Sequence, residues 1–158
     1  MKNNFSYIIV LFSILFCSKV SFGQSNFRFI KNANKQSISF KLINNLVVLP
    51  IEVNGKELNF ILDSGVGTTI LFNINNKDSV ELKNAEKIKL KGLGSEDAID
   101  AILSKGNIFS IHNIKSINED LYVVFDDSFD LSSKLGITIH GIIGYEILKD
   151  FVIKINYG

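Results

Sequence analysis

The sequence predicts an all-β protein, either a sandwich or a small barrel, from the way its apolar residues are arranged. Short segments in which apolar and polar residues alternate, or apolar residues run together, are separated by turn-forming Asn and Gly residues. The chain of 158 residues contains 46% hydrophobic residues and shows neither an internal repeat nor a linker. We therefore expect one domain with enough apolar side chains for its own core.

The N-terminus has the three-part pattern of a secretory signal. Lys2 supplies a positive charge, residues 5–17 are almost wholly apolar, and Ser21 and Gly23 frame a cleavage site. The apolar run is short for a membrane span, although an uncleaved anchor is the alternative. We expect residues 1–23 to be removed and the exported protein to be periplasmic or secreted, without stable membrane insertion.

Charge and cysteine content argue against several classes of function. The chain carries 17 Lys and Arg against 16 Asp and Glu, which gives no reason to expect nucleic acid or an anionic membrane as a partner. The single cysteine, Cys17, lies in the signal segment, so the mature domain would depend on its core rather than on disulfides. Only two histidines, His112 and His140, are present, which argues against a zinc site. We expect His112 on a surface strand and His140 at an exposed or capped strand end.

Residues 24–36 are polar and are expected to be an extended lead-in to a domain that covers residues 37–158. The acidic run 126–130 lacks the glycine and the distal glutamate of a calcium loop, so it is expected to be a solvated turn. The chain stops at Gly158 directly after an apolar segment. This end leaves open a natural short form or a truncated domain.

Two asparagine turns organise the first strands. Asn44-Asn45 separates an alternating segment from a longer apolar one, in which Pro50 predicts either a sheet edge or a break because proline cannot donate to a ladder. Asn54-Gly55 is a strong two-residue hairpin signal, and the strand that returns from it ends at Asp63. The segments expected to be strands are 37–42, 46–53, 58–62, 80–82, 88–91, 98–103, 107–111, 121–125, 137–144 and 151–157. Short helical turns are expected at 131–135 and 145–150.

The segment 60–71 combines a carboxylate with a mostly apolar surrounding. Asp63, Ser64 and Gly65 interrupt this apolar run, and burying a carboxylate is costly unless it is paired or hydrogen-bonded. Local chemistry alone predicts a turn, because Asp and Ser bond to nearby backbone and Gly accepts a positive φ. The same residues are also candidates for a functional site.

Residues 61–65 after an Asn-Gly hairpin, and Gly141-Ile142-Ile143-Gly144 before a short helix, resemble the retropepsin-like aspartyl proteases. The likeness is greatest to exported bacterial members, whose lobe is often followed by a PDZ domain, and it extends from about residue 37 to residue 157. It implies a single closed β-barrel lobe with one short C-terminal helix. It also implies an aspartic-type endopeptidase, in which two carboxylates share one proton and activate a water molecule.

The resemblance implies a role for three groups of residues. Asp63 would supply one catalytic carboxylate. The residues that would support the active-site loop are Ser64, Gly65, Thr68, Gly141, Ile142, Ile143 and Gly144. The residues that would form the tip of a flap over a bound peptide are Gly92, Leu93, Gly94 and Ser95. Neither a metal ion nor another cofactor is implied.

The chain carries one Asp-Ser-Gly triplet, so it supplies only half of a catalytic pair. Asp126-Asp127-Ser128 is followed by Phe129 rather than by glycine. The resemblance therefore implies a homodimer or a second protease lobe, acting on a peptide or protein substrate. Gly67 and Tyr145 stand where viral members carry an acidic and a basic side chain, which leaves specificity open. The alternative function is a non-catalytic peptide-binding module, or pseudoenzyme, with the same fold.

Overall fold

The computed structural model describes residues 27–72, 74, 80–91, 98–125 and 131–157. Three of the sequence predictions lie outside these residues, namely the signal segment 1–23, the flap candidate 92–95 and the acidic run 126–130. Within the described ranges, no helix has both the length and the apolar character needed to cross a membrane.

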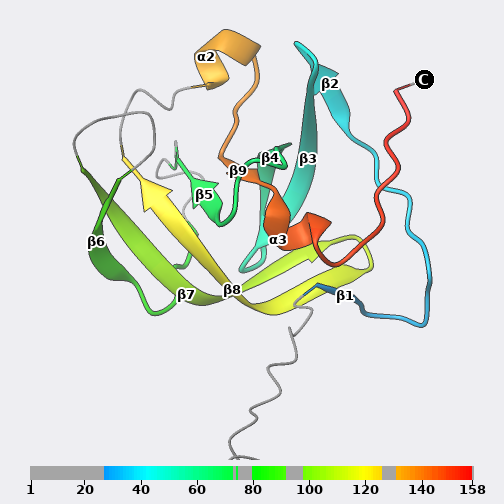
Figure 1. Cartoon of the computed structure of the whole chain (residues 1–158), viewed down its shortest axis with the longest axis horizontal. Coiled ribbons are helices and arrows are strands. Elements are labelled where there is room, and N and C mark those ends of the chain that lie inside the picture. Colours follow the sequence, from blue (N-terminus) through cyan, green and yellow to red (C-terminus); the bar gives the residue numbers. More distant parts are fainter. Residues whose placement is uncertain (1–26, 73, 75–79, 92–97, 126–130, 158) are drawn as a thin grey trace, which may run out of the picture.

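Most of the regular secondary structure in the described residues is strand, which confirms the all-β prediction (Figure 1). The strands are β1 (Arg28–Phe29), β2 (Lys41–Ile43), β3 (Leu46–Val53), β4 (Lys56–Leu62), β5 (Thr69–Leu71), β6 (Glu86–Leu90), β7 (Ile99–Ile111), β8 (Ile114–Val124) and β9 (Gly141–Ile143). Two helices of four residues each follow late in the chain, α2 (Ser132–Leu135) and α3 (Tyr145–Leu148). Both lie where the sequence predicts helical turns.

All of these strands belong to one strongly bent sheet. Their order is β1-β8-β5-β9-β4-β3-β7-β6, with β2 added beside β3 and a further pairing between β7 and β8. The pairings thus return to β8, but β3 meets β7 at only two residue pairs, Glu52 with Ser110 and Val53 with Phe109. The sheet is therefore strongly bent but is not assigned as a closed barrel. A closed barrel is the form that the resemblance implies.

The predicted asparagine turns and the strand between them are present. Asn44 and Asn45 have φ values of 49° and 63°, and Asn54 and Gly55 have 51° and 86°, as expected for tight hairpin turns with left-handed central residues. Between them, β3 has the predicted bounds and does not break at Pro50. On the side away from β4, its ladder passes from β2 to β7 around that residue, so the proline sits at a local edge.

The two strands predicted at 98–103 and 107–111 are a single strand, β7, of 13 residues. Gly106, with a φ of 75°, lies inside a shift of register with β8 between Ser104 and Asn107. Such a bulge bends a strand without ending it, so the two predicted segments form one strand. His112 lies in the hairpin turn that follows, with a φ of 50°, and not on a strand.

Four predicted strands are shorter than expected or are not strands. Residues 80–82 and 151–157 are irregular, β2 begins only at Lys41, and β9 contains only residues 141–143. Alternating residues favour an extended backbone, but a strand also requires a neighbour with which to form a ladder. The sequence pattern carries no information about that neighbour. In contrast, β8 begins at Ile114, well before the predicted 121. The sequence pattern missed this first part of the strand because two of its buried residues, Ser116 and Glu119, are polar.

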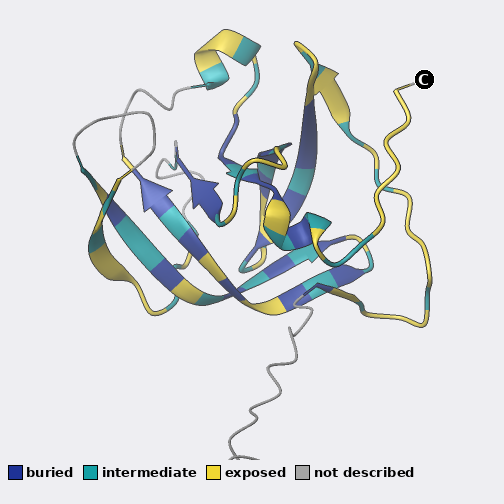
Figure 2. Ribbon diagram, viewed as in Figure 1, coloured by how far each residue is buried: buried dark blue, intermediate teal, exposed yellow. Residues whose placement is uncertain are grey.

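The core lies between the facing sides of the bent sheet, where buried residues alternate with intermediate or exposed ones along β7 and β8 (Figure 2). Phe109 is fully buried and contacts two other phenylalanines. Its ring centroid lies 6.3 Å from that of Phe27 and 6.4 Å from that of Phe60. Phe27 belongs to the segment that the sequence indicates as a polar lead-in, yet it is only 2% exposed. The lead-in therefore contributes to the core and, through β1, to the sheet.

Candidate functional site

The short strand β9 lies between β4 and β5 and positions the loop that carries Asp63. It pairs parallel to β4, with Leu62 opposite Ile143, and antiparallel to β5, with Ile70 opposite Ile142. The Asp63 N–H continues the first ladder by donating to the Ile143 carbonyl at 2.9 Å. The chain therefore leaves β4 on one side of β9, turns at residues 63–68, and returns as β5 on the other side.

The turn itself is closed by the carboxylate and the carbonyl of one residue. The Gly65 N–H donates to Asp63 Oδ1 at 2.9 Å, and the Val66 N–H donates to the Asp63 carbonyl at 3.1 Å. These bonds form the local Asp turn that the residue types predict. Asp63 is exposed, as are Ser64 and Gly65, so the carboxylate is held by backbone yet open to solvent.

Two glycines of the segment 141–144 allow this loop to pack closely. A Cβ on Gly144 would lie 1.8 Å from the Asp63 carbonyl oxygen and 2.8 Å from that of Val66. A Cβ on Gly141 would lie 2.3 Å from the Ile70 carbonyl oxygen. Because real Cβ atoms do not approach other heavy atoms to less than 3.0 Å, both positions require glycine for close packing. The structure thus brings the two segments on which the resemblance rests into direct contact.

Helix α3 begins at the same place and adds a bond to the loop. The Tyr145 N–H donates to the Val66 carbonyl at 2.8 Å, while the N–H groups of Ile147 and Leu148 both donate to the Gly144 carbonyl at 3.1 Å. Ile147 is buried in the core, which fixes the helix against the sheet. The sequence did not indicate that the backbone of Val66 and Tyr145 connects the loop with the helix, because main-chain bonds leave no residue signature.

The remaining predicted support residues differ in burial. Ile143 is fully buried, Ile142 and Thr68 are half-buried, and Ser64 is exposed. The neighbour of Thr68, Thr69, is the buried threonine, with 2% exposure at the start of β5. The sequence could not distinguish these two threonines because they are adjacent.

His140, next to Gly141, has a structural position. It is 6% exposed. Its ring Nδ1 accepts the backbone N–H of Asn59 at 3.0 Å, and its backbone N–H donates to the Asn59 carbonyl at 2.9 Å. These bonds agree with the prediction of a capped strand end. Among the residues that the structure describes, no three His, Cys, Asp or Glu side chains gather in a way that could hold a metal ion.

Comparisons with known proteins add independent information about this arrangement. A family model described as "Aspartyl protease" matches residues 49–147, a range that includes the Asp63 loop, β9 and most of α3. No curated protein matches the sequence. Among solved structures, the chain is similar to EIAV protease complexed with the inhibitor HBY-793, with 18% identity and a TM-score of 0.47. That similarity covers 72% of this chain and 93% of the other.

Proposed function

Because the chain belongs to the aspartyl protease family, we propose that it is one lobe of an aspartic-type endopeptidase in which Asp63 is the catalytic carboxylate. One observation carries the proposal. The exposed carboxylate of Asp63 stands at the end of β4, with Oδ1 held by the Gly65 N–H at 2.9 Å. The close packing of Gly144 under the same loop restricts its movement, and a fixed carboxylate open to solvent suits a group that must bind water and substrate.

The proposed reaction requires two carboxylates that share one proton. The ionised carboxylate takes a proton from water as the water oxygen attacks the scissile carbonyl carbon. The protonated carboxyl donates a hydrogen bond to the carbonyl oxygen, which takes up the developing negative charge. As the C–N bond breaks, the amine nitrogen receives a proton from the pair. Like charges held close together cannot both be ionised, which keeps one proton on the pair.

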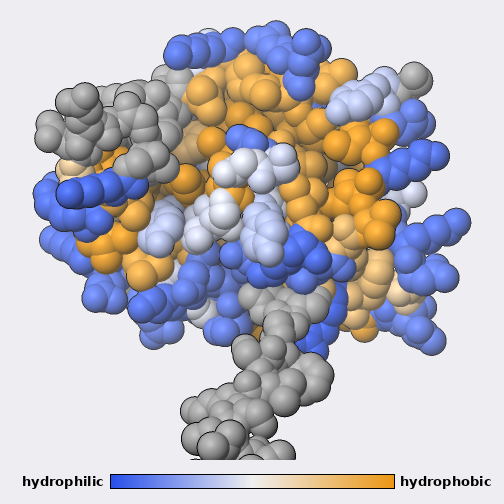
Figure 3. Space-filling model, viewed as in Figure 1, coloured by the Kyte–Doolittle hydropathy of each residue, from blue (hydrophilic) through white to orange (hydrophobic). Residues whose placement is uncertain are grey.

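This lobe supplies one Asp-Ser-Gly triplet, so we propose that a second copy supplies the other carboxylate across a two-fold axis. Support comes from the C-terminal residues, which alternate like a strand but belong to no ladder within the described chain. Their apolar members are exposed, with Val152 at 103%, Ile153 at 41% and Tyr157 at 64%. Hydrophobic side chains gather over the side where these residues lie beside β2 (Figure 3). An exposed apolar segment that belongs to no ladder of the described chain is suited to pairing with another chain.

The proposal extends to substrate and location. A peptide or protein substrate would lie along the exposed Asp63 loop, and residues 92–95 remain the flap candidate that the resemblance implies. The apolar N-terminal segment supports export, with the mature protein periplasmic or secreted.

The decisive experiment compares peptide hydrolysis by the mature chain with that of Asp63→Asn. We expect hydrolysis at acid pH that is lost in the variant, because Asn can neither accept the proton from water nor return it. Asp120→Asn is the matched control, since Asp120 is an exposed carboxylate on β8, and it should retain activity.

Sedimentation of the mature chain tests the second lobe and separates the two functions. A concentration-dependent equilibrium between monomer and dimer is expected. Hydrolysis that survives in Asp63→Asn would contradict the assignment of the catalytic residue. A strict monomer that binds peptides without cleaving them would instead identify a non-catalytic binding module.

A further inference from the structure

Helix α3 supports the Asp63 loop but is too short to be stable by itself. It has four residues, and its N-cap, Gly144, makes no side-chain capping bond. Helices of this length do not form without tertiary contacts, because nucleation costs more than so few hydrogen bonds return. The contacts at the end of α3 therefore decide how firmly its first residues are held.

The first of these contacts involves Lys149, which directly follows α3. Its Nζ forms an ion pair with Glu146, and the side chains of Lys149 and Glu146 are 24% and 20% exposed, although Lys149 counted with its backbone is an exposed residue. The same Nζ lies 5.8 Å from the centroid of the Tyr145 ring. Lys149 lies after the C-terminal end of α3, and its cation thus contacts the first two residues of the helix, Tyr145 and Glu146.

A second carboxylate, on the sheet, attracts this cation electrostatically. Glu119 on β8 is only 3% exposed, and its Oε1 accepts the Ser116 hydroxyl at 2.5 Å. Burial by itself would lower the pKa of Lys149, but the hydrogen bond and charge of Glu146, followed by the charges of Glu119 and Asp150, outweigh it and raise that pKa. Lys149 therefore remains charged and offsets part of the cost of burying a carboxylate on β8.

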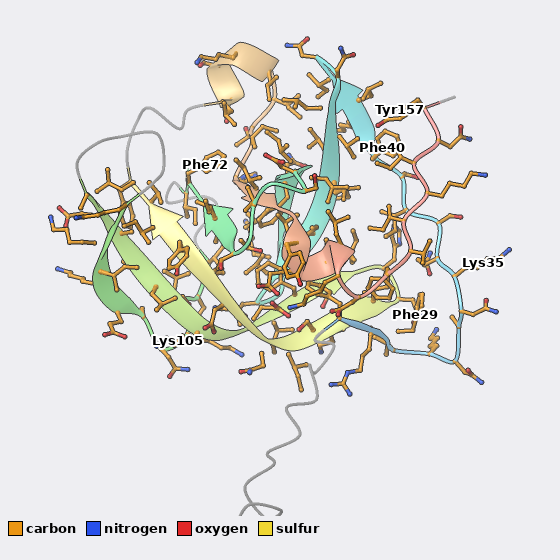
Figure 4. The ribbon with its side chains drawn as sticks, viewed as in Figure 1. Phe29, Lys35, Phe40, Phe72, Lys105 and Tyr157 are labelled. Carbon is orange, nitrogen blue, oxygen red and sulfur yellow. The ribbon has the colours of Figure 1, made fainter. Side chains whose placement is uncertain are left out.

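A third contact joins the end of α3 to the start of the described chain. Asp150 Oδ2 accepts the N–H of buried Phe27 at 2.8 Å. Two residues further on, Phe29 contacts Phe151 edge to face, with ring centroids 5.5 Å apart. Figure 4 shows Phe29 beside the segment that follows the helix. The entry strand β1 and the exit from α3 are thus fastened to each other.

We propose that Lys149 and Asp150 are positioning residues for the Asp63 loop. Asp150 fastens the end of α3 to the backbone of Phe27, and Lys149 joins that end to Glu146 and to the ring of Tyr145. Together these contacts hold Gly144 and Tyr145 under the loop. Neither side chain would touch substrate. The effect on catalysis rests on the proposed function, whereas the effect on the loop does not.

Amide hydrogen exchange in the mature chain tests the proposal without relying on activity. In Lys149→Met, the N–H groups of Asp63 and Tyr145 should exchange roughly tenfold faster, the loss expected when a charged hydrogen-bonding partner is removed. The Asn54 N–H, bonded to the Ile108 carbonyl at 2.8 Å, should keep its rate because Asn54 lies in the turn before β4, whereas Asp63 follows the other end of that strand. Lys149→Arg should restore protection by restoring the charge.

Lys134→Met is the matched control, because Lys134 lies in the last turn of the other four-residue helix and is exposed. Glu119→Gln gives a second test, since it removes the charge and retains an oxygen for the Ser116 hydroxyl. This variant decides the matter if Lys149→Met does not fold. Selective loss of protection at Asp63 and Tyr145 supports the proposal in either variant.

Two results would overturn it. Exchange in Lys149→Met that equals exchange in Lys134→Met would mean that the contact holds nothing in place. Acceleration of all three reporter amides together would indicate a general loss of stability instead of positioning. Where the wild type hydrolyses peptides, Lys149→Met should lower kcat with little change in KM. A wild type without hydrolysis would refute the proposed function and leave the exchange result valid.

Discussion

Replacing Gly144 with alanine tests how closely the Asp63 loop is packed against the start of α3. The new Cβ would lie 1.8 Å from the Asp63 carbonyl oxygen, whereas real Cβ contacts are not shorter than 3.0 Å, so the two would have to separate by at least about 1.2 Å. The obstacle is a backbone oxygen, which has no alternative rotamer.

The separation would break the bonds that join the loop to its support. The Asp63 N–H donates to Ile143 at 2.9 Å and the Tyr145 N–H donates to Val66 at 2.8 Å. Each such bond contributes about 1 kcal/mol to stability. Together with the clash, we expect a loss of about 3 kcal/mol in the free energy of unfolding, at the upper end of typical overpacking costs.

Chemical denaturation followed by circular dichroism measures this loss, with Gly67→Ala as the control. A Cβ on Gly67 meets nothing within 4 Å, so this variant should be neutral or slightly more stable, because alanine reduces the entropy of the unfolded chain. If Gly144→Ala were as stable as Gly67→Ala, the packing argument for the loop would be refuted. Peptide hydrolysis should fall in the first variant and persist in the second.

Two further predictions concern other contacts. Asn107→Ala should lower the free energy of unfolding by about 2 kcal/mol. The side chain of Asn107 is fully buried, accepts the Ser104 hydroxyl at 3.1 Å and donates to the Glu119 carbonyl at 3.1 Å. Its removal leaves these buried groups unpaired. Denaturation of exposed Asn118→Ala provides the control, and equal stability of the two variants would contradict the prediction. The raised pKa of Lys149 means that its stabilising charge is fully present below the ordinary pKa of 10.5 and is lost as the pH rises through the higher folded value. Wild type should therefore lose more stability than Lys149→Met in denaturation measured above that pH, and parallel losses would show that the charge contributes nothing.

Local features of the fold could be predicted because their causes are local. The bounds of β3 and both asparagine turns follow from residue types within a few positions of each other. The turn at Asp63 belongs to the same class, since Asp63 Oδ1 and the Gly65 N–H are two residues apart. In the same way, alternation identified β6 without reference to any partner strand.

By itself, then, the sequence determined the all-β class, the hairpins around Asn44-Asn45 and Asn54-Gly55, and the Asp-Ser-Gly turn as a candidate site. Only the tertiary structure decided which extended segments became strands. Phe27 is buried although its neighbours are polar, and residues 151–157 are irregular although their pattern predicts a strand. The same holds at the Asp63 loop, where Gly144 is required by a carbonyl far away in the sequence. Burial, strand pairing and close backbone contact depend on which distant segments meet, and a pattern read along one stretch of chain does not contain that information.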